Sequence, residues 1–145
     1  MKENPVRYSS AVGESWHHLM LKVKYCHKIF DEQRVRDNCY KLLLEAFDKY
    51  KIRYKAIGFD SDHVHGLVDI GLYSRPQFAK LVKGYVGRKL LEKFPNIKKK
   101  YFWNSGLWNP STFLESTGKD MNFIERYVRK QRYGEGLQKK LSDYY

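Results

Sequence analysis

The chain has 145 residues, of which 42% are hydrophobic and 30% are charged. With 28 Lys and Arg against 16 Asp and Glu, its net charge is +12. This composition excludes a disordered chain and fits a single domain over residues 1–145. Two cysteines are too few for a disulfide scaffold or a cysteine-built zinc site, so a cytoplasmic location is expected. No apolar run is long enough to cross a membrane.

The positive charge indicates a polyanionic partner. Each phosphate that a Lys or Arg neutralises releases a counterion, so the excess favours nucleic acid. Aromatic residues make up 16% of the chain and are interleaved with basic ones, as in "YKIRYK" and "RYVRKQRY". Aromatic rings beside cations are typical of proteins that stack the bases of single strands. Composition therefore favours a nucleic-acid binder but indicates no chemistry.

The first half of the chain predicts three strands and a helix. Trp16–Tyr25 predicts a strand, because apolar residues alternate through it. Residues 31–52 carry apolar residues at helical spacing, which predicts an amphipathic helix with Asp31 as its N-cap. Two short strands follow over residues 53–60 and 63–70, and a tight turn between them predicts a hairpin.

The second half predicts two helices around one strand. Ser74–Gln77 fits a capping box, which opens a helix that ends at Pro95. A loop and a strand near Ser111–Ser116 follow, and Asp120 then caps a last helix, "DMNFIERYVRKQRY". The order β-α-β-β-α-β predicts an α+β, ferredoxin-like (RRM-like) antiparallel sheet with two helices on one face. The other face is left for a ligand or for the last helix.

Two histidines stand one residue apart in the predicted strand "HVHGLVDI". Alternate residues of a strand share a face, so His63 and His65 project together while Val64 and Val68 point the opposite way. If the valines pack on the helices, the histidines lie on the open face as a pair of candidate divalent-metal ligands. The alternative is two half-exposed histidines beside Asp62.

His17 and His18 provide a contrast. They are adjacent in a predicted strand, so they point to opposite faces and cannot chelate an ion in the same way. A zinc site would need a third ligand beyond the H-x-H pair, typically His, Cys or a carboxylate. The remaining donors must come from elsewhere in the chain.

The last helix places Tyr127 and Gln131 one turn apart, with Cβ atoms about 5–6 Å from each other. Ile124 and Val128 form an apolar edge that predicts docking on the sheet, and basic residues surround the pair. A free tyrosine has a pKa of about 10, and nearby cations would favour its phenolate. The amide oxygen of Gln131 is a candidate for the missing ligand. Alternatively, Tyr127 is a core or rim aromatic and Gln131 a solvated residue.

Five segments, in order from about Ser15 to Arg132, resemble the single-tyrosine HUH transposases of small bacterial and archaeal insertion sequences, the IS200-like superfamily. HUH denotes His, a hydrophobic residue and His. The segments are "HHLMLKVKYCHKIF", "DHVHGLVDI", "FAKLVKGYVGRKL", "FWNSGLWNPSTFLESTG" and "YVRKQ". Five ordered matches are far more specific than H-x-H alone. One departure is Ser61, which stands where family members often carry Pro.

The resemblance implies a metal-dependent transposase that cuts and rejoins single-stranded DNA at the ends of its element. By match, Tyr127 is the nucleophile, and its attack gives a 5′-phosphotyrosine link and a free 3′-OH for strand transfer. His63, His65 and Gln131 are implied to hold one divalent cation, Mg²⁺ or Mn²⁺. The resemblance also implies hairpins in the DNA and a homodimer that can share its active sites, with Gly118 as a hinge.

Basic residues on the second helix, after it and on the last helix are candidates for DNA contacts. Together they predict a steep salt dependence of binding. They are Lys80, Lys83, Arg88, Lys89, Lys98, Lys99, Lys100, Arg126 and Arg129.

Two other functions remain open at this point. A non-catalytic ferredoxin-like binding module explains the charge and the aromatic residues, but not the histidines, tyrosine and glutamine together. A replication initiator or relaxase would share the HUH site, but such proteins are usually larger than 145 residues.

Overall fold

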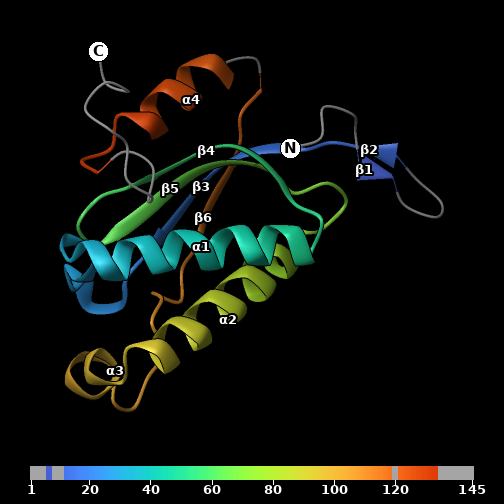
Figure 1. Cartoon of the computed structure of the whole chain (residues 1–145). Coiled ribbons are helices and arrows are strands. Elements are labelled where there is room, and N and C mark those ends of the chain that lie inside the picture. Colours follow the sequence, from blue (N-terminus) through green and yellow to red (C-terminus); the bar gives the residue numbers. More distant parts are fainter. Residues whose placement is uncertain (1–5, 8–11, 119–120, 134–145) are drawn as a thin grey trace.

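Alternating apolar residues build the central sheet of the computed structural model, which describes residues 6–7, 12–118 and 121–133. Its four strands are β3 (Trp16–Lys22), β4 (Arg53–Phe59), β5 (His63–Asp69) and β6 (Phe113–Ser116). They lie in the order β4-β5-β3-β6, and every neighbouring pair is antiparallel. The predicted α+β, ferredoxin-like arrangement is confirmed (Figure 1). Two shorter strands, β1 (Val6–Arg7) and β2 (Val12–Gly13), pair with each other.

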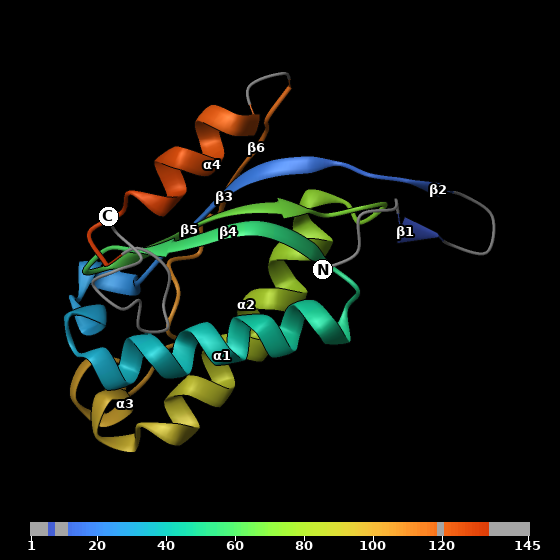
Figure 2. The same ribbon diagram turned by 45° about the horizontal axis from the view of Figure 1, so that its top comes forward.

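Two helices, α1 (Gln33–Lys49) and α2 (Arg75–Lys93), cover one face of the sheet (Figure 2). Leu21 of β3 and Val64 and Val68 of β5 belong to the core between these layers and are at most 1% exposed. Full burial of such a side chain stabilises a fold by about 1.5–3 kcal/mol. The alternation of β5 therefore leaves its other residues for the opposite face.

The start of α1 differs from the prediction. Two 3₁₀ turns, η1 (Lys24–Cys26) and η2 (Ile29–Asp31), join β3 to α1. Glu32, not Asp31, takes the N-cap position, and it makes no capping hydrogen bond. The Asp31 carboxylate instead accepts a hydrogen bond of 2.6 Å from the Ser61 hydroxyl. Asp31 as an N-cap is therefore wrong, because its side chain ties the start of α1 to the β4–β5 turn.

The capping box at the start of α2 is confirmed. The Gln77 N–H donates to Ser74 Oγ at 3.2 Å, and the Ser74 N–H donates to Gln77 Oε1 at 3.0 Å. Pro95 follows the end of α2, as predicted, but it also begins a second helix, α3 (Pro95–Tyr101). The prediction of a loop here is wrong, because Pro is well suited to the first turn of a helix.

The last helix of the described residues, α4 (Met121–Arg129), lies on the sheet face opposite α1 and α2 (Figures 1 and 2). Val128 is fully buried against Ala56 and Leu67, and Ile124 packs beside them, so the predicted docking edge is confirmed. The helix ends at Arg129, earlier than predicted. Asp120, predicted to cap this helix, lies outside the described residues.

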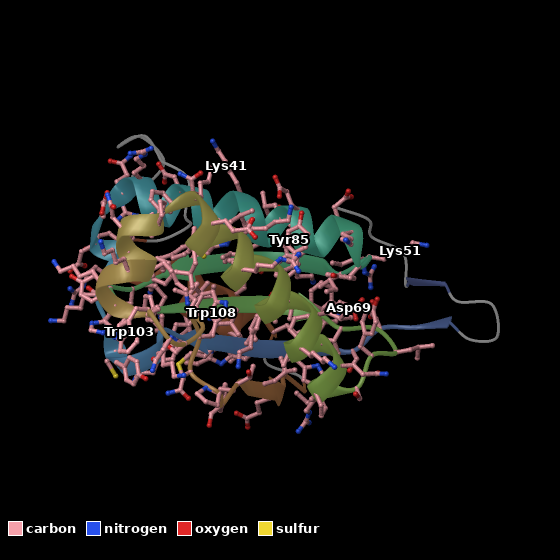
Figure 3. All side chains as sticks on the ribbon, turned by 90° about the horizontal axis from the view of Figure 1, so that it is seen from below. Lys41, Lys51, Asp69, Tyr85, Trp103 and Trp108 are labelled. Carbon is pink, nitrogen blue, oxygen red and sulfur yellow. The ribbon has the colours of Figure 1, made fainter. Side chains whose placement is uncertain are left out.

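A buried ion pair links β4 to β5 at one end of the sheet. Arg53 Nη2 lies 2.6 Å from Asp69 Oδ2 and 2.7 Å from Glu14 Oε2. Asp69 Oδ1 also accepts a hydrogen bond of 2.6 Å from the Ser15 N–H. Figure 3 shows Asp69 on the side of the molecule away from Trp103, which follows α3.

Within the described part of the chain, no helix is long and apolar enough to cross a membrane.

Candidate active site

Strand register gathers three histidines on the sheet face that α4 covers. His65 pairs with Met20 of β3 and with Gly58 of β4, while His18 pairs with Leu67 two residues further along. Residues paired across antiparallel strands share a face. His63 and His65 therefore point away from the core that holds Val64 and Val68, as the alternation predicts.

Tyr127 brings its ring from α4 to these histidines. The ring centroids of His63 and His65 are 4.8 Å apart, and those of His65 and Tyr127 are 5.3 Å apart. The ring centroid of His18 lies 5.1 Å from that of His65, and the His18 ring meets Tyr127 edge-on at 5.7 Å. Tyr127 remains 45% exposed. Tyr127, the predicted nucleophile, therefore borders the histidine pair of its own chain and is partly open to solvent.

Gly58 lets α4 come this close to the sheet. A Cβ atom at Gly58 would lie 2.0 Å from the carbonyl oxygen of Val128, a distance that real Cβ atoms do not show. The backbone of α4 therefore rests directly on β4 beside His65. Sequence reasoning missed this residue, although a glycine inside a strand often marks a close backbone approach.

Gln131 lies beyond the end of α4, in a bend rather than in the helix. Its Nε2 donates a hydrogen bond of 3.2 Å to the carbonyl oxygen of Tyr127. Its Cγ would lie 3.2 Å from a Cβ at Gly58, and Gly58 pairs with His65. In the described part of the chain, no hydrogen bond joins Gln131 to either histidine of the pair. The structure thus places Gln131 one strand away from His65.

Each histidine of the pair has its Nδ1 held by a neighbour. His63 Nδ1 lies 2.7 Å from Asp62 Oδ1, and His65 Nδ1 lies 2.9 Å from His18 Nε2. Burial, with smaller effects of the adjacent His63 and His18, lowers the pKa of His65 to about 4. Burial also lowers the pKa of His18, against an opposing effect of Glu115. His65 and His18 are therefore neutral at pH 7, the state in which an imidazole can bind a cation.

A divalent cation bound by the two histidines would need further ligands that are not His, Cys, Asp or Glu side chains. Among the described residues, no group of three or more His, Cys, Asp or Glu is arranged to hold a metal ion. The imidazoles of His63 and His65 are the nearest candidate ligands to each other, and the side chain of Gln131 lies one strand away, beside Gly58. Two nitrogens with an amide oxygen suit Mn²⁺ better than Mg²⁺, which prefers oxygen ligands.

Several of the predicted DNA-contacting cations bond to the protein itself. Lys83 Nζ donates to the carbonyl oxygen of Asn109 at 2.7 Å and to Thr112 Oγ1 at 2.9 Å. Lys98 Nζ donates to two carbonyl oxygens of the following loop, and Arg129 donates to the carbonyl oxygen of Lys55 at 2.8 Å. These three cations hold loops and α4 in place.

The other candidates lie at the surface, with Lys89 half-buried over the Tyr85 ring. The exposed ones are Lys80, Arg88, Lys99, Lys100 and Arg126. A cavity of about 620 Å³ lies between α2 and residues 105–108, and Arg88 lines it together with Trp108. Figure 3 shows Trp108 near the middle of this face and Trp103 at the α3 end.

Comparison with known proteins gives consistent matches. Residues 11–131 match the family model described as "Transposase IS200 like". The ISDra2 transposase TnpA of Deinococcus radiodurans is 27% identical over 117 residues, which cover 79% of this chain and 82% of that protein.

Two solved structures resemble this fold. A Deinococcus radiodurans R1 crystal structure, described as that of a transposase, has a TM-score of 0.68 and 25% identity, covering 87% of this chain and 97% of that chain. A REP-associated tyrosine transposase bound to a REP hairpin has a TM-score of 0.55 and 9% identity, covering 86% and 70% respectively. The second is a likeness of fold alone.

Proposed function

Because the chain belongs to the IS200-like transposase family, a family of DNA-cleaving and rejoining enzymes, we propose that it cuts single-stranded DNA through Tyr127 with the help of a divalent cation. The observation that carries this proposal is the contact between Tyr127 and the rings of His65 and His18. A tyrosine that served only as a rim aromatic would not need a histidine pair with both Nδ1 atoms held.

The proposed reaction is a transesterification. Tyr127 gives up its phenolic proton as its oxygen attacks the scissile phosphorus, the bond from phosphorus to the 3′-oxygen breaks, and the leaving oxygen takes up one proton to become a 3′-OH. The 5′-phosphate remains esterified to Tyr127, which conserves the energy of the bond, so resealing needs no ATP. Attack by a 3′-OH on this ester reverses the step and permits strand transfer.

His63, His65 and Gln131 are the residues proposed to hold the cation, Mg²⁺ or Mn²⁺. When bound, the ion would act as a Lewis acid on a non-bridging phosphate oxygen. The neutral state of His65 supports this role, because a protonated imidazole has no lone pair to offer. Asp62 supports it further, since its carboxylate accepts from His63 Nδ1 and leaves Nε2 free.

The proposed partner is single-stranded DNA with hairpins at the element ends. The net charge of +12 supports a polyanionic ligand, and the REP-associated transposase of similar fold is described as bound to a hairpin. We also propose a homodimer, in which α4 of one subunit can serve the histidine pair of the other. Gly118, which precedes α4 in the chain, has a φ of +59°, a conformation that suits glycine at a hinge.

The proposal is tested with end-labelled single-stranded DNA from the element ends and MnCl₂. A covalent protein–DNA adduct should form, should not form when EDTA is present from the start, and should be absent from Tyr127→Phe. Binding without any adduct in the wild-type protein would favour the non-catalytic binding module instead. Gel filtration tests the dimer, and a monomer at micromolar concentration would contradict the shared site.

A further inference from the structure

We propose that His18 is a positioning residue that fixes the tautomer of His65 and thereby keeps His65 Nε2 ready for a cation. This inference rests on the metal-binding role proposed for His65. It adds a residue from β3 to a site otherwise built from β5, α4 and the bend that follows α4.

The geometry brings one nitrogen of each ring into direct contact. His18 Nε2 lies 2.9 Å from His65 Nδ1, and the planes of the two rings differ by 24°. His18 is itself held edge-on by Phe113, with ring centroids 5.5 Å apart, and by Tyr127 at 5.7 Å. Rings on two sides therefore orient His18, and its Nε2 faces His65.

Only one proton can occupy this hydrogen bond. If His18 donates it, neutral His65 carries its own proton on Nε2, and neither of its nitrogens is available for a ligand. If His65 donates it, Nε2 of His65 keeps a free lone pair, and His18 carries its proton on Nδ1. Cation binding at His65 Nε2 therefore requires His18 to be the acceptor.

The tautomer of His63 is fixed in the same way, but by a different hydrogen-bond acceptor. Its Nδ1 is tied to Asp62 Oδ1, and a carboxylate can only accept. The Asp62 side chain is 23% exposed, whereas His65 is 4% exposed. A carboxylate beside His65 would add a buried charge, which is costly, so a neutral imidazole is the better acceptor there.

The first test reads the tautomer without any metal. Long-range ¹H–¹⁵N correlation spectra of the metal-free protein at pH 7.5 distinguish protonated from unprotonated ring nitrogens, and His65→Gln assigns the His65 signals. The proposal predicts a protonated Nδ1 and an unprotonated Nε2 on His65. A His65 that carries its proton on Nε2 would overturn it.

The second test measures Mn²⁺ affinity with MnCl₂ alone, by electron paramagnetic resonance, in the Tyr127→Phe background so that no change passes through the tyrosine. His18→Leu removes the acceptor and should weaken Mn²⁺ binding by about 10–100-fold. His18→Gln keeps an oxygen acceptor, so its Mn²⁺ affinity should be closer to that of the parent than to that of His18→Leu. His17→Leu, on the neighbouring residue of the same strand, should bind Mn²⁺ like the parent.

The outcomes separate this inference from the proposed function. A parent protein that binds no Mn²⁺ would overturn the proposed metal site and the inference with it. A parent that binds Mn²⁺ while His18→Leu binds it equally well would overturn only the role of His18. Equal losses in His18→Leu and His18→Gln would also count against it, because they would show that packing alone matters.

Discussion

At the scale of single residues, the site depends on which nitrogen of each histidine carries a proton. His63 and His65 each have Nδ1 engaged, by Asp62 and His18 respectively. The burial that keeps His65 neutral has a second effect, on stability. It makes the folded chain a weaker proton acceptor than the unfolded chain at this residue.

We predict that acid weakens the fold partly through His65. Its pKa falls from 6.5 in the unfolded chain to about 4 in the folded one. Between these values the unfolded chain binds more protons, so the free energy of unfolding decreases as the pH falls from 6.5 towards 4, and the contribution is fully present above 6.5. Urea unfolding in EDTA at several pH values measures this slope. His65→Gln should flatten it, and an unchanged slope would contradict the prediction.

The orientation of the histidine pair was predictable from the sequence, because alternation in one strand is local. His18 was not identified as part of the site. Adjacency to His17 indicates only that the two histidines point to opposite faces, and it does not say which of them meets His65. That depends on the register between β3 and β5, a contact between segments more than forty residues apart in the chain.

At the scale of elements, the position of α4 decides whether Tyr127 reaches the histidines. Its buried contact is small, with Val128 against Ala56 and Leu67. The approach is possible because Gly58 has no side chain. Tyr133 adds a further anchor beyond the helix, since its N–H donates to the carbonyl oxygen of Phe59 at 2.9 Å.

We predict that Gly58→Ala displaces α4. The added methyl group would meet the Val128 carbonyl oxygen, so the variant should lose about 1–3 kcal/mol of unfolding free energy and most of its adduct formation. Gly84→Ala is the matched control, because a Cβ there meets nothing within 4 Å, and it should stabilise α2 by up to about 1 kcal/mol. Thermal unfolding and adduct yield check both. Full adduct formation by Gly58→Ala would contradict this prediction, because it would show that activity does not need α4 to rest on β4 at Gly58.

One lysine, Lys98, ties the end of a second element, α3, to the loop that follows it. Lys98 Nζ donates to the carbonyl oxygens of Phe102 and Ser105 at 2.7 and 2.6 Å, which fixes the loop after α3. We predict that Lys98→Met lowers the free energy of unfolding by about 1–3 kcal/mol. Lys99→Met, at an exposed position, should change it by less than about 0.5 kcal/mol. If urea unfolding gave the same free energy of unfolding for Lys98→Met and Lys99→Met, the hydrogen bonds of Lys98 would contribute nothing to stability.

The elements were predicted well where apolar periodicity was strong and poorly where it was weak. The sheet strands and α1 carry such periodicity, and α2 was marked by its capping box, whereas α3 is a short lysine-rich helix with no buried residue. Ser61 was noted in the sequence as a departure from the family pattern, which made a turn here harder to predict. In the structure its hydroxyl donates to Asp31 and accepts from Arg132 Nη1 at 2.9 Å, so it links three segments.

At the scale of the whole molecule, the sheet separates the residues that stabilise the fold from the residues of the candidate site. The main core lies on the α1–α2 side, and the candidate site lies on the α4 side (Figure 2). Substitutions at the site face therefore leave most of the buried apolar surface intact. The positive charge is spread over the surface, with a concentration on α3 and its neighbours.

We predict that single-stranded DNA binding weakens steeply with salt. Each phosphate contact contributes about −0.7 to the slope of log K against log salt concentration. The double variant Lys99→Ala with Lys100→Ala should make this slope less negative, because both side chains are exposed. Fluorescence anisotropy from 50 to 300 mM NaCl, in buffer with EDTA, measures it. An unchanged slope would exclude these two lysines from the DNA interface.

The most direct test of the central claim identifies the residue that carries the DNA. The adduct formed with Mn²⁺ is digested with nuclease and protease, and the peptide bearing the 5′-phosphate is sequenced by mass spectrometry. The account predicts that the phosphate is on Tyr127, which borders His65 and His18. A phosphate on Tyr133 or any other residue, or an adduct that still forms in Tyr127→Phe, would contradict it.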